Sequence, residues 1–336
     1  TYLQTMASAG SKSWVTMLSL LVAAQLQASL AAGGWDYGKN GPNRWAELFP
    51  EFCAGDKQSP IDLSTQTALQ SSLIRKYVFH QSSIAAGVKF TLKNDGHKIE
   101  LNWSPELSIT MGQTAADQMY TAAQLHWHWG SSDQQGSEHT LDKKSYAAEG
   151  HLVFYNSKDY ANISMAASRP NGLAVLGVFY EVSATDNPLF KDLEKALAND
   201  TLINMGGAAE VAARTDFNMF STFLPSNQDE FFRYDGSLTT PVCYESVLWT
   251  VYRQAVPISA RQLQMLRRLH YSDNSSMVNN FRPPLPLNPG NRPGTPRTLY
   301  RTFSAGAAGL APSALSTVGL ILAALLAGRL FVAVEL

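Results

Sequence analysis

The 336-residue sequence has little of several features that mark particular classes of protein. Its 26 lysines and arginines are balanced by 27 acidic residues, so the formal net charge of −1 provides no basic field for nucleic acid. It has no recognisable glycine-rich phosphate loop, no internal repeat and only two cysteines. These absences argue against a nucleic-acid partner and against a nucleotide-phosphate site.

What the sequence does have is three histidines in two short runs of aromatic and aliphatic residues. In residues 124–129, His126 and His128 are two positions apart, and side chains two apart on a strand point to the same face. His151 begins a second strand-like run that ends at Tyr155. If the two strands are neighbours, the three imidazoles form one set that suits Zn²⁺. No cysteine lies nearby to fill a fourth position, so the pattern predicts an open zinc site of the catalytic type.

The alternative for each histidine is a structural role. A single histidine in such a strand is more often a hydrogen-bonded core residue, and a His-x-His pair alone leaves both interpretations open. The preceding residues favour a metal. Gln124 lies two positions before His126, and Glu149 lies two before His151, so each has a same-face partner. Metal-bound imidazoles need such partners to fix their tautomer and orientation.

Longer motifs surround these histidines. Residues 137–141 (SEHTL) and 146–151 (YAAEGH) resemble the signature of the α-class carbonic anhydrases. The resemblance covers most of the chain, through WDYG at 35–38, NGP at 40–42, QSPID at 58–62, NDGH at 94–97, LAVLG at 173–177, GSLTTP at 236–241 and NFRP at 280–283.

The resemblance implies a fold and an activity. The expected fold is mainly β with peripheral helices, a single catalytic domain over residues 34–285 around a large, mostly antiparallel twisted sheet. The expected activity is reversible hydration of carbon dioxide to bicarbonate and a proton, by attack of zinc-bound hydroxide. The alternative is a non-catalytic carbonic anhydrase-like binding module on the cell surface. Such relatives typically lack a zinc histidine, whereas His126, His128 and His151 are all present.

The resemblance also implies roles for further residues. Thr239 would accept a hydrogen bond from the hydroxide and donate one to Glu138, Thr240 would contact bicarbonate, and His97 would be the proton shuttle. An apolar wall for carbon dioxide would consist of Val153, Val175, Leu238, Val247 and Trp249. Supporting residues around the ligands would be Gln124, Glu149, Asn280 and Tyr37.

Two positions depart from the common family pattern. Asp95 and Glu100 stand where the best-known members carry asparagine near the channel. Carboxylates close to an imidazole stabilise its charged form. We therefore expect Asp95 and Glu100 to favour the protonated state of His97.

Cys53 and Cys243 can be read as a disulfide or as two free buried thiols, the latter being favoured for a cytosolic protein. The equivalent positions are bridged in secreted and membrane-bound members of the family, so the resemblance implies a bridge. Residues 1–33 read as a leader with a signal peptide. Sequons at Asn102, Asn162, Asn199 and Asn274 fit glycosylation on the secretory route.

The C-terminal part changes in composition. Residues 286–305 are rich in proline and predict an extended stalk. Residues 306–336 combine small residues with a hydrophobic tail, which is typical of a glycolipid (GPI) attachment signal, and a transmembrane helix is the alternative. Arg329 interrupts the apolar run and no basic flank follows, which favours the lipid anchor. We therefore expect a protein at the extracellular face of the plasma membrane, or a secreted one.

Overall fold

The computed structural model describes residues 34–84, 88–105, 107–114, 119–211, 217–289 and 297–302. The predicted leader (1–33) and the predicted attachment signal (306–336) lie outside these residues. Within the described ranges, no helix is long and apolar enough to cross a bilayer.

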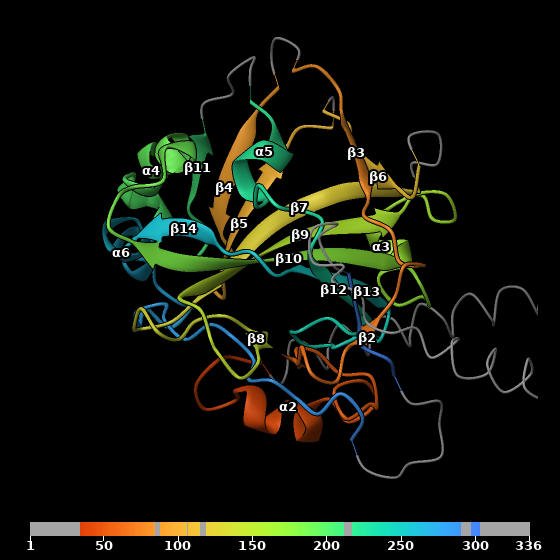
Figure 1. Ribbon diagram of the computed structural model, residues 1–336. Coiled ribbons are helices and arrows are strands. Elements are labelled where there is room, and N and C mark those ends of the chain that lie inside the picture. Colours follow the sequence, from red (N-terminus) through yellow and green to blue (C-terminus); the bar gives the residue numbers. More distant parts are fainter. Residues whose placement is uncertain are drawn as a thin grey trace, which may run out of the picture.

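A twisted sheet of 13 strands forms the body of the molecule (Figure 1). Ten strands follow the order β11-β4-β5-β7-β9-β10-β13-β12-β15-β2, β14 pairs with β10, and β6 pairs with both β3 and β7. Most neighbours are antiparallel, whereas β10 is parallel to β13 and β14, and β15 is parallel to β2. The prediction of a mainly β, single-domain fold around a mostly antiparallel sheet is confirmed.

The strands of this sheet are β2 (Leu69–Gln70), β3 (Val78–Gln81), β4 (Phe90–Asn94), β5 (Ile99–Trp103), β6 (Ile109–Gly112), β7 (Tyr120–Trp129), β9 (Ala148–Asn156), β10 (Leu173–Ser183), β11 (Ala208–Val211), β12 (Phe231–Gly236), β13 (Val247–Tyr252), β14 (Val256–Ser259) and β15 (Tyr300–Arg301). A separate parallel pair consists of β1 (Asp62–Leu63) and β8 (Thr140–Leu141). The long central strands β7, β9 and β10 are buried over most of their length.

The helices are short and peripheral. They are α2 (Pro42–Leu48), α3 (Ile163–Ala166), α4 (Lys191–Leu197), α5 (Met219–Phe223) and α6 (Ala260–Arg267), with 3-10 turns η1 (Pro188–Phe190) and η2 (Asp200–Leu202). Figure 1 places α4 and α6 together at one end of the sheet and α2 on the side of β8. Helix α6 starts with a capping box, in which Ser259 and Gln262 exchange hydrogen bonds of 3.1 Å.

Alternation along the strands divides the buried side chains between two faces. On β9, Leu152 and Phe154 join the larger hydrophobic core, which is continuous with the helices α4 and α6. Val153 joins a smaller core on the other face, together with Val175 and Trp249. Because successive residues of a strand point to opposite sides, His151 lies on the face of Val153. The histidines therefore belong to the face with the smaller core.

The predicted stalk is wrong for residues 297–302. Tyr300 and Arg301 form β15, which pairs with β12 and β2, and Leu299 is buried in the smaller core. Arg297 is buried as well, and its guanidinium donates to backbone carbonyls of Gln58, Asp235 and Leu287. The proline-rich composition concealed this strand, because its stability comes from distant partners. The described catalytic domain therefore extends to Thr302.

A disulfide joins Cys53 and Cys243, as predicted, with an S–S distance of 2.02 Å and Cα atoms 5.0 Å apart. Both sulfurs pack against Trp45 of α2. Cys243 N–H also donates to the carbonyl of Thr240 at 2.8 Å. The bridge therefore fixes the loop after β12, which carries Thr239 and Thr240, to the N-terminal part of the domain.

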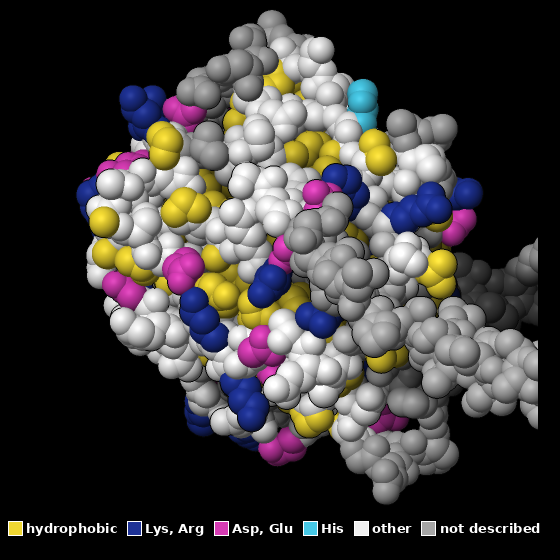
Figure 2. Space-filling model, in the orientation of Figure 1, with side chains coloured by type: hydrophobic (Ala, Val, Ile, Leu, Met, Phe, Trp, Pro, Cys, Tyr) yellow, Lys and Arg dark blue, Asp and Glu magenta, His cyan; other side chains and the backbone are white. Residues whose placement is uncertain are grey.

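The face shown in Figure 2 has acidic and basic side chains interspersed among polar and apolar ones. Its described residues show no broad field of one sign, which agrees with the formal net charge of −1. This distribution gives no support to a nucleic-acid surface.

Candidate metal centre

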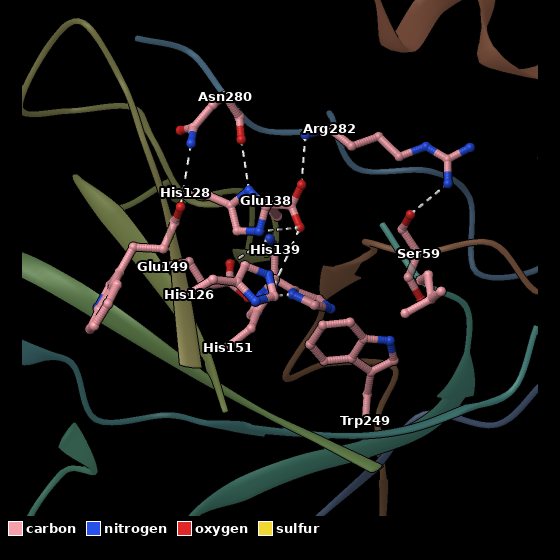
Figure 3. Close-up of polar contacts among 12 residues, drawn as sticks. Ser59, His126, His128, Glu138, His139, Glu149, His151, Trp249, Asn280 and Arg282 are labelled. Atoms are coloured by element: carbon pink, nitrogen blue, oxygen red, sulfur yellow. Dashed lines mark hydrogen bonds and ion pairs between the residues drawn. The ribbon is translucent and has the colours of Figure 1, made fainter. Parts of the chain in front are cut away.

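The three histidines converge because β7 and β9 are antiparallel neighbours. In their register His126 lies directly opposite His151, and a β-bulge between Ala122 and Gln124 precedes the pair. His128 follows on the same face of β7, so all three rings point to one place (Figure 3). One ring nitrogen of each lies within 4.8 Å of the others, and all three residues are buried. The predicted set of three imidazoles is therefore assembled.

Hydrogen bonds fix which nitrogen of each ring is free. His126 Nδ1 lies 2.8 Å from Gln124 Oε1, and His151 Nε2 lies 2.8 Å from Glu149 Oε1. His128 Nδ1 lies 2.7 Å from the backbone oxygen of Asn280. Because the three partner atoms are acceptors, these nitrogens carry the hydrogen in the neutral rings. The remaining nitrogens, Nε2 of His126 and His128 and Nδ1 of His151, present lone pairs to the centre.

The rings are also held in the charge state that a metal requires. Burial lowers the pKa of all three histidines, and it lowers that of His128 to about 3. The mutual proximity of the rings acts in the same direction for His126 and His128. Metal ligation needs neutral imidazole, so the chain presents the ligands already deprotonated at neutral pH.

Glu138 lies beside this centre. Its Oε1 accepts the backbone N–H of Arg282 at 2.8 Å, while Oε2 lies 3.5 Å from His128 Nε2. Oε2 and His128 Nε2 are both buried without a hydrogen-bond partner among the described residues. Buried polar atoms are rarely left so, and a cation with its water would satisfy both. The residues present therefore fit a metal ion.

Thr239 lies beside Glu138, as the sequence resemblance implies. Burial raises the pKa of Glu138 well above its usual value, and the hydroxyl of Thr239 and the amide of Arg282 act in the opposite direction. Thr239 is buried and Thr240 is half-buried. The hydroxyl of Thr239 is thus directed to the carboxyl that borders the metal centre.

A series of buried hydrogen bonds, which the sequence analysis missed, supports His151. Glu149 Oε1 lies 2.7 Å from His139 Nδ1, its Oε2 accepts the His139 N–H at 2.8 Å, and His139 Nε2 lies 2.6 Å from the Tyr234 hydroxyl. Tyr234 in turn contacts Ser59 Oγ at 2.9 Å. His139, Glu149 and His151 could also be read as a metal group, but their direct contacts leave no room for an ion. The sequence signal for this series of hydrogen bonds was the place of His139 in the motif at 137–141.

The charge of Glu149 is stabilised by this arrangement. Burial alone raises its pKa, but the imidazoles of His139 and His151 more than offset that effect and hold the pKa below its usual value. Gly177, which faces His151 on β10, leaves space for the carboxylate, since a Cβ there would lie 3.2 Å from Glu149 Oε1. An ionised Glu149 accepts a hydrogen bond from His151 Nε2–H, and this contact directs the Nδ1 atom of His151 to the centre.

The predicted apolar wall lies next to the histidines. Val153 faces Val175 across β9 and β10, and Val175 faces Trp249 across β10 and β13. The Trp249 ring lies 4.8 Å from the ring of His151, centroid to centroid. Val247 is buried in the same smaller core, and Leu238 packs against it while remaining partly exposed. All five predicted residues therefore belong to one apolar region beside the histidines.

Asn280 contacts the ligand strand and the turn with His97, whereas Tyr37 lies in the N-terminal aromatic cluster. Asn280 is fully buried, accepts the Trp129 N–H through Oδ1 at 2.7 Å, and donates through Nδ2 to the carbonyl of His97 at 3.2 Å. It therefore connects the ligand strand to the turn with His97. Tyr37 packs edge-on against Trp45, and its hydroxyl is buried without a partner among the described residues.

His97 is half-buried on the turn between β4 and β5. Its ring stacks on Trp35 at 4.0 Å between centroids, and Nε2 lies 3.1 Å from the carbonyl oxygen of Trp35. Since a carbonyl only accepts, Nε2 carries the hydrogen and Nδ1 keeps its lone pair. The ring is thus oriented by the N-terminal segment.

Asp95 and Glu100 do not act on His97 as expected. Both carboxylates pair with Lys98, at 2.7 Å and 3.0 Å, and Asp95 Oδ1 accepts the backbone N–H of His97 instead of a ring proton. Lys98 is the intervening residue whose effect the sequence comparison left out. The expectation that the two carboxylates favour protonated His97 therefore has no support in these contacts.

The sequons occupy different environments. Asn162, Asn199 and Asn274 are exposed, at the start of α3, at the start of η2 and in a turn, respectively. Asn102 is half-buried in β5. Three of the four predicted sites are therefore accessible in the folded domain.

Comparison with known proteins adds to this geometry. The model of the family "Eukaryotic-type carbonic anhydrase" matches residues 40–292. Human carbonic anhydrase 7 is 36% identical over 263 residues, which cover 76% of this chain and 94% of that protein. Human carbonic anhydrase 12 is 36% identical over 308 residues, 88% of this chain and 80% of that protein. Mouse carbonic anhydrase 7 is 36% identical over 267 residues, 75% of this chain and 94% of that protein.

Proposed function

Because this chain belongs to the eukaryotic-type carbonic anhydrase family, we propose that it catalyses the zinc-dependent, reversible hydration of carbon dioxide to bicarbonate and a proton. The observation that carries the proposal is the set of three buried, neutral imidazoles whose unbonded nitrogens converge. Zinc is the ion that this donor set and the family suggest, since three protein nitrogens leave a fourth position open.

His126, His128 and His151 would hold the zinc through the nitrogens that their other hydrogen bonds leave free. When bound, zinc supplies a water of lowered pKa, an effect for which carbonic anhydrases are themselves the standard example. The chain contributes the orientation. Gln124, Glu149 and the carbonyl of Asn280 each accept a hydrogen bond from the single N–H of one neutral ring, so no ligand needs to rotate or lose a proton on binding.

Thr239 and Glu138 would orient the attacking oxygen. A cation held by the three histidines would favour the ionised form of the buried Glu138. Its carboxylate would then accept a hydrogen bond from the Thr239 hydroxyl, so the Thr239 oxygen could only accept a hydrogen bond from water at the centre. That water then has a lone pair directed to the substrate. The hydrogen bond of Thr239 to the Glu138 side chain, and the 3.5 Å between Glu138 Oε2 and His128 Nε2, support this role.

Carbon dioxide has no net charge, so its binding place is expected to be apolar. Val153, Val175 and Trp249 provide such a surface directly beside His151. Leu238 and Val247 extend it, and Thr240 at its polar edge would contact bicarbonate. The Trp249 ring contacts the His151 ring, so the apolar surface lies directly beside one of the three proposed zinc ligands.

Proton removal requires a group that changes charge near neutral pH, and histidine is that residue. We assign this role to His97, whose Nδ1 is left free by the contact of Nε2 with Trp35. Asn280 links the backbone of His97 to the ligand strand, which supports a fixed position for the turn. His97 would carry protons between the centre and solvent.

We further propose an extracellular protein, secreted or held at the plasma membrane by a C-terminal glycolipid anchor. The disulfide and the three exposed sequons support an oxidising, secretory environment. Treating cells that express the full chain with a phosphatidylinositol-specific phospholipase tests the anchor. Release of the protein supports it, while retention on the membrane after treatment contradicts it.

The catalytic proposal is tested by carbon dioxide hydration with residues 34–302. The fragment ends there because β15 belongs to the sheet. Activity should disappear with a zinc chelator and return with zinc. It should be absent in His126→Ala and retained in His80→Ala, a matched change at an exposed histidine on β3. A folded, zinc-loaded and inactive fragment would contradict the proposal and favour the non-catalytic binding module.

A further inference from the structure

Exposed apolar side chains gather at one end of the sheet. Among the described residues, six large apolar side chains are exposed, and three of them lie on or next to β2 and β15: Leu69 is 57% exposed, Leu73 88% and Tyr300 37%. Figure 1 shows β2 at the opposite side of the sheet from β11 and α4. A single exposed apolar residue is ordinary, whereas a group of them marks a contact surface.

The three side chains belong to one surface, which we call the β2 edge. Leu69 and Tyr300 are register partners in the parallel pair of β2 and β15, so their side chains leave the sheet on the same face. Ile74 and Tyr300 line the same cavity, which brings the segment after β2 against β15. Leu73 directly precedes Ile74 and is therefore close to this face as well. The β2 edge thus presents apolar surface at the end of the sheet.

The chain leaves the described domain at this edge. Thr302 follows β15 and is the last described residue. The run of small residues that typifies a glycolipid attachment site begins at Ser304 and continues through Gly306. Four residues span at most about 14 Å when they are fully extended, so attachment at Gly306 would leave only this length and that of the anchor's glycan between β15 and the bilayer. The expected stalk adds no distance there, because residues 297–302 are packed into the domain.

A bilayer suits the β2 edge better than a second copy of the chain does. β2 has only two residues, and three side chains are far fewer than the roughly 20 to 30 residues that each partner gives to a stable protein interface. A bilayer contact can be small, because the anchor already holds the protein at the surface and raises the effective concentration of the contact. Arg75 is exposed two positions after Leu73 and can extend its guanidinium to the phosphates of the headgroups.

We propose that the β2 edge rests on the bilayer to which the chain is anchored. Leu69 and Leu73 would enter the boundary between headgroups and acyl chains, and the ring of Tyr300 would lie at the level of the headgroups. The inference rests on the proposed glycolipid anchor and adds which surface of the domain faces the membrane. β12, β13 and β10 lie between β15 and the ligand strand β9, so the metal centre takes no part in the contact.

Fluorescence of an added tryptophan tests the contact. Leu73→Trp is made in the full chain, which is purified from cell membranes in detergent and reconstituted into phosphatidylcholine vesicles with or without brominated acyl chains. Bromine quenches a tryptophan that touches the acyl chains, and the parent gives the background of the native tryptophans. We expect brominated lipid to quench the added tryptophan by at least about half.

Met205→Trp is the matched control. Met205 is 58% exposed and lies between η2 and β11, at the other end of the sheet from β2. Its added tryptophan should be quenched no more than those of the parent. Cleavage by the phosphatidylinositol-specific phospholipase should release both variants and abolish the quenching of Leu73→Trp, because the contact is weak without the anchor.

Serine variants localise the contact. Tyr300→Trp, as a probe on β15, should lose most of its quenching when Leu69 and Leu73 are both replaced by serine, and should keep it with Met205→Ser. Because these side chains are exposed, the melting temperature and the rate of carbon dioxide hydration should stay as in the parent. If Leu73→Trp does not fold, Leu69→Trp serves as the probe.

Equal quenching of the Leu73→Trp and Met205→Trp variants would overturn the proposal, and release by the phospholipase in the same experiment would show that the anchor itself stands. Quenching confined to Leu73→Trp in a protein that the phospholipase does not release would support the membrane contact and contradict the lipid anchor. A full chain absent from the membrane fraction would contradict both.

Discussion

On β9, His151 and Val153 point to one face of the sheet, while Leu152 and Phe154 point to the other. The first face holds two buried polar atoms, His128 Nε2 and Glu138 Oε2, that have no hydrogen-bond partner among the described residues. The second face is packed with aliphatic and aromatic side chains that continue to α4 and α6. Neighbouring residues of one strand thus serve ligand binding and folding, respectively.

This difference has a physical consequence. A side chain on the packed face contributes by excluding water, so its loss leaves a void and lowers the free energy of unfolding. A side chain on the metal face contributes by orientation, so its loss lowers metal affinity or activity while much of the packing remains. The following predictions separate these two effects.

The largest effect is expected for His128→Ala. It removes one of the three proposed zinc ligands and leaves the Asn280 carbonyl without its donor. Activity should fall about a thousandfold or more, because the metal contributes several kcal/mol to the barrier. Hydration rate and zinc content are measured together. Full zinc content with an unchanged hydration rate would show that His128 is not a zinc ligand.

Phe154→Ala should give the reverse pattern. Phe154 is fully buried in the larger core, so truncation should cost about 3 to 5 kcal/mol of the free energy of unfolding. The folded fraction should still bind zinc with nearly normal affinity. Denaturant unfolding and zinc titration of the same sample check this. A loss of zinc affinity without a loss of stability would break the separation of the two faces.

Replacing both cysteines by serine should reduce stability by about 2 to 5 kcal/mol, because the bridge closes a long loop of the unfolded chain. The sequence separation of the two cysteines is 190 residues. Activity of the folded variant should decrease only through the loop that carries Thr239. Thermal unfolding with and without a reductant provides the measurement, and unchanged stability would show that the tertiary contacts of Trp45 suffice.

Glu149→Gln should reduce zinc affinity about 10- to 100-fold, which is the usual effect of removing a carboxylate behind a histidine ligand. The amide oxygen can take the place of Oε1, which faces both rings, but it carries no charge, and the NH₂ group then opposes the His139 backbone N–H that Oε2 accepts. Competition with a chelator measures the affinity. Gln124→Glu is the matched change behind His126, where the acceptor is kept, and it should retain zinc more tightly than Glu149→Gln.

The smallest effect concerns pH in the metal-free chain. Burial holds the pKa of His126, His128 and His151 below the usual 6.5. Below that pH the three imidazoles therefore bind protons in the unfolded chain that they do not bind in the folded chain. Their contribution to the free energy of unfolding is fully present above pH 6.5. It is lost progressively as the pH falls toward the pKa of the folded state, which is about 3 for His128. Each proton changes the slope by about 1.4 kcal/mol per pH unit. Urea unfolding at several pH values should show a shallower slope for His128→Asn.

The sequence alone allowed most of the metal centre to be predicted. The two-residue spacing put His126 and His128 on one face, and the same spacing put Gln124 and Glu149 behind their ligands. These inferences succeeded because strand alternation is a local property of the backbone. The pairing of Cys53 with Cys243 followed from the resemblance and was found in the structure.

Other features depended on contacts between distant parts of the chain. The carbonyl that accepts the hydrogen bond of His128 belongs to Asn280. The hydrogen bonds that begin at Glu149 continue through His139 to Tyr234 and Ser59. Lys98 neutralises the two carboxylates that were expected to act on His97. No spacing rule reports which side chains meet after packing.

The amino-acid sequence by itself therefore determined the ligand set, the alternation that assembles it and the family to which the chain belongs. The tertiary structure alone decided which nitrogen of each ring is free, that residues 297–302 complete the sheet, and that Leu69 and Tyr300 are neighbours at its edge. The physical reason is that alternation is fixed within a strand. Hydrogen-bond partners and desolvation are instead fixed by elements that approach one another only in the folded chain.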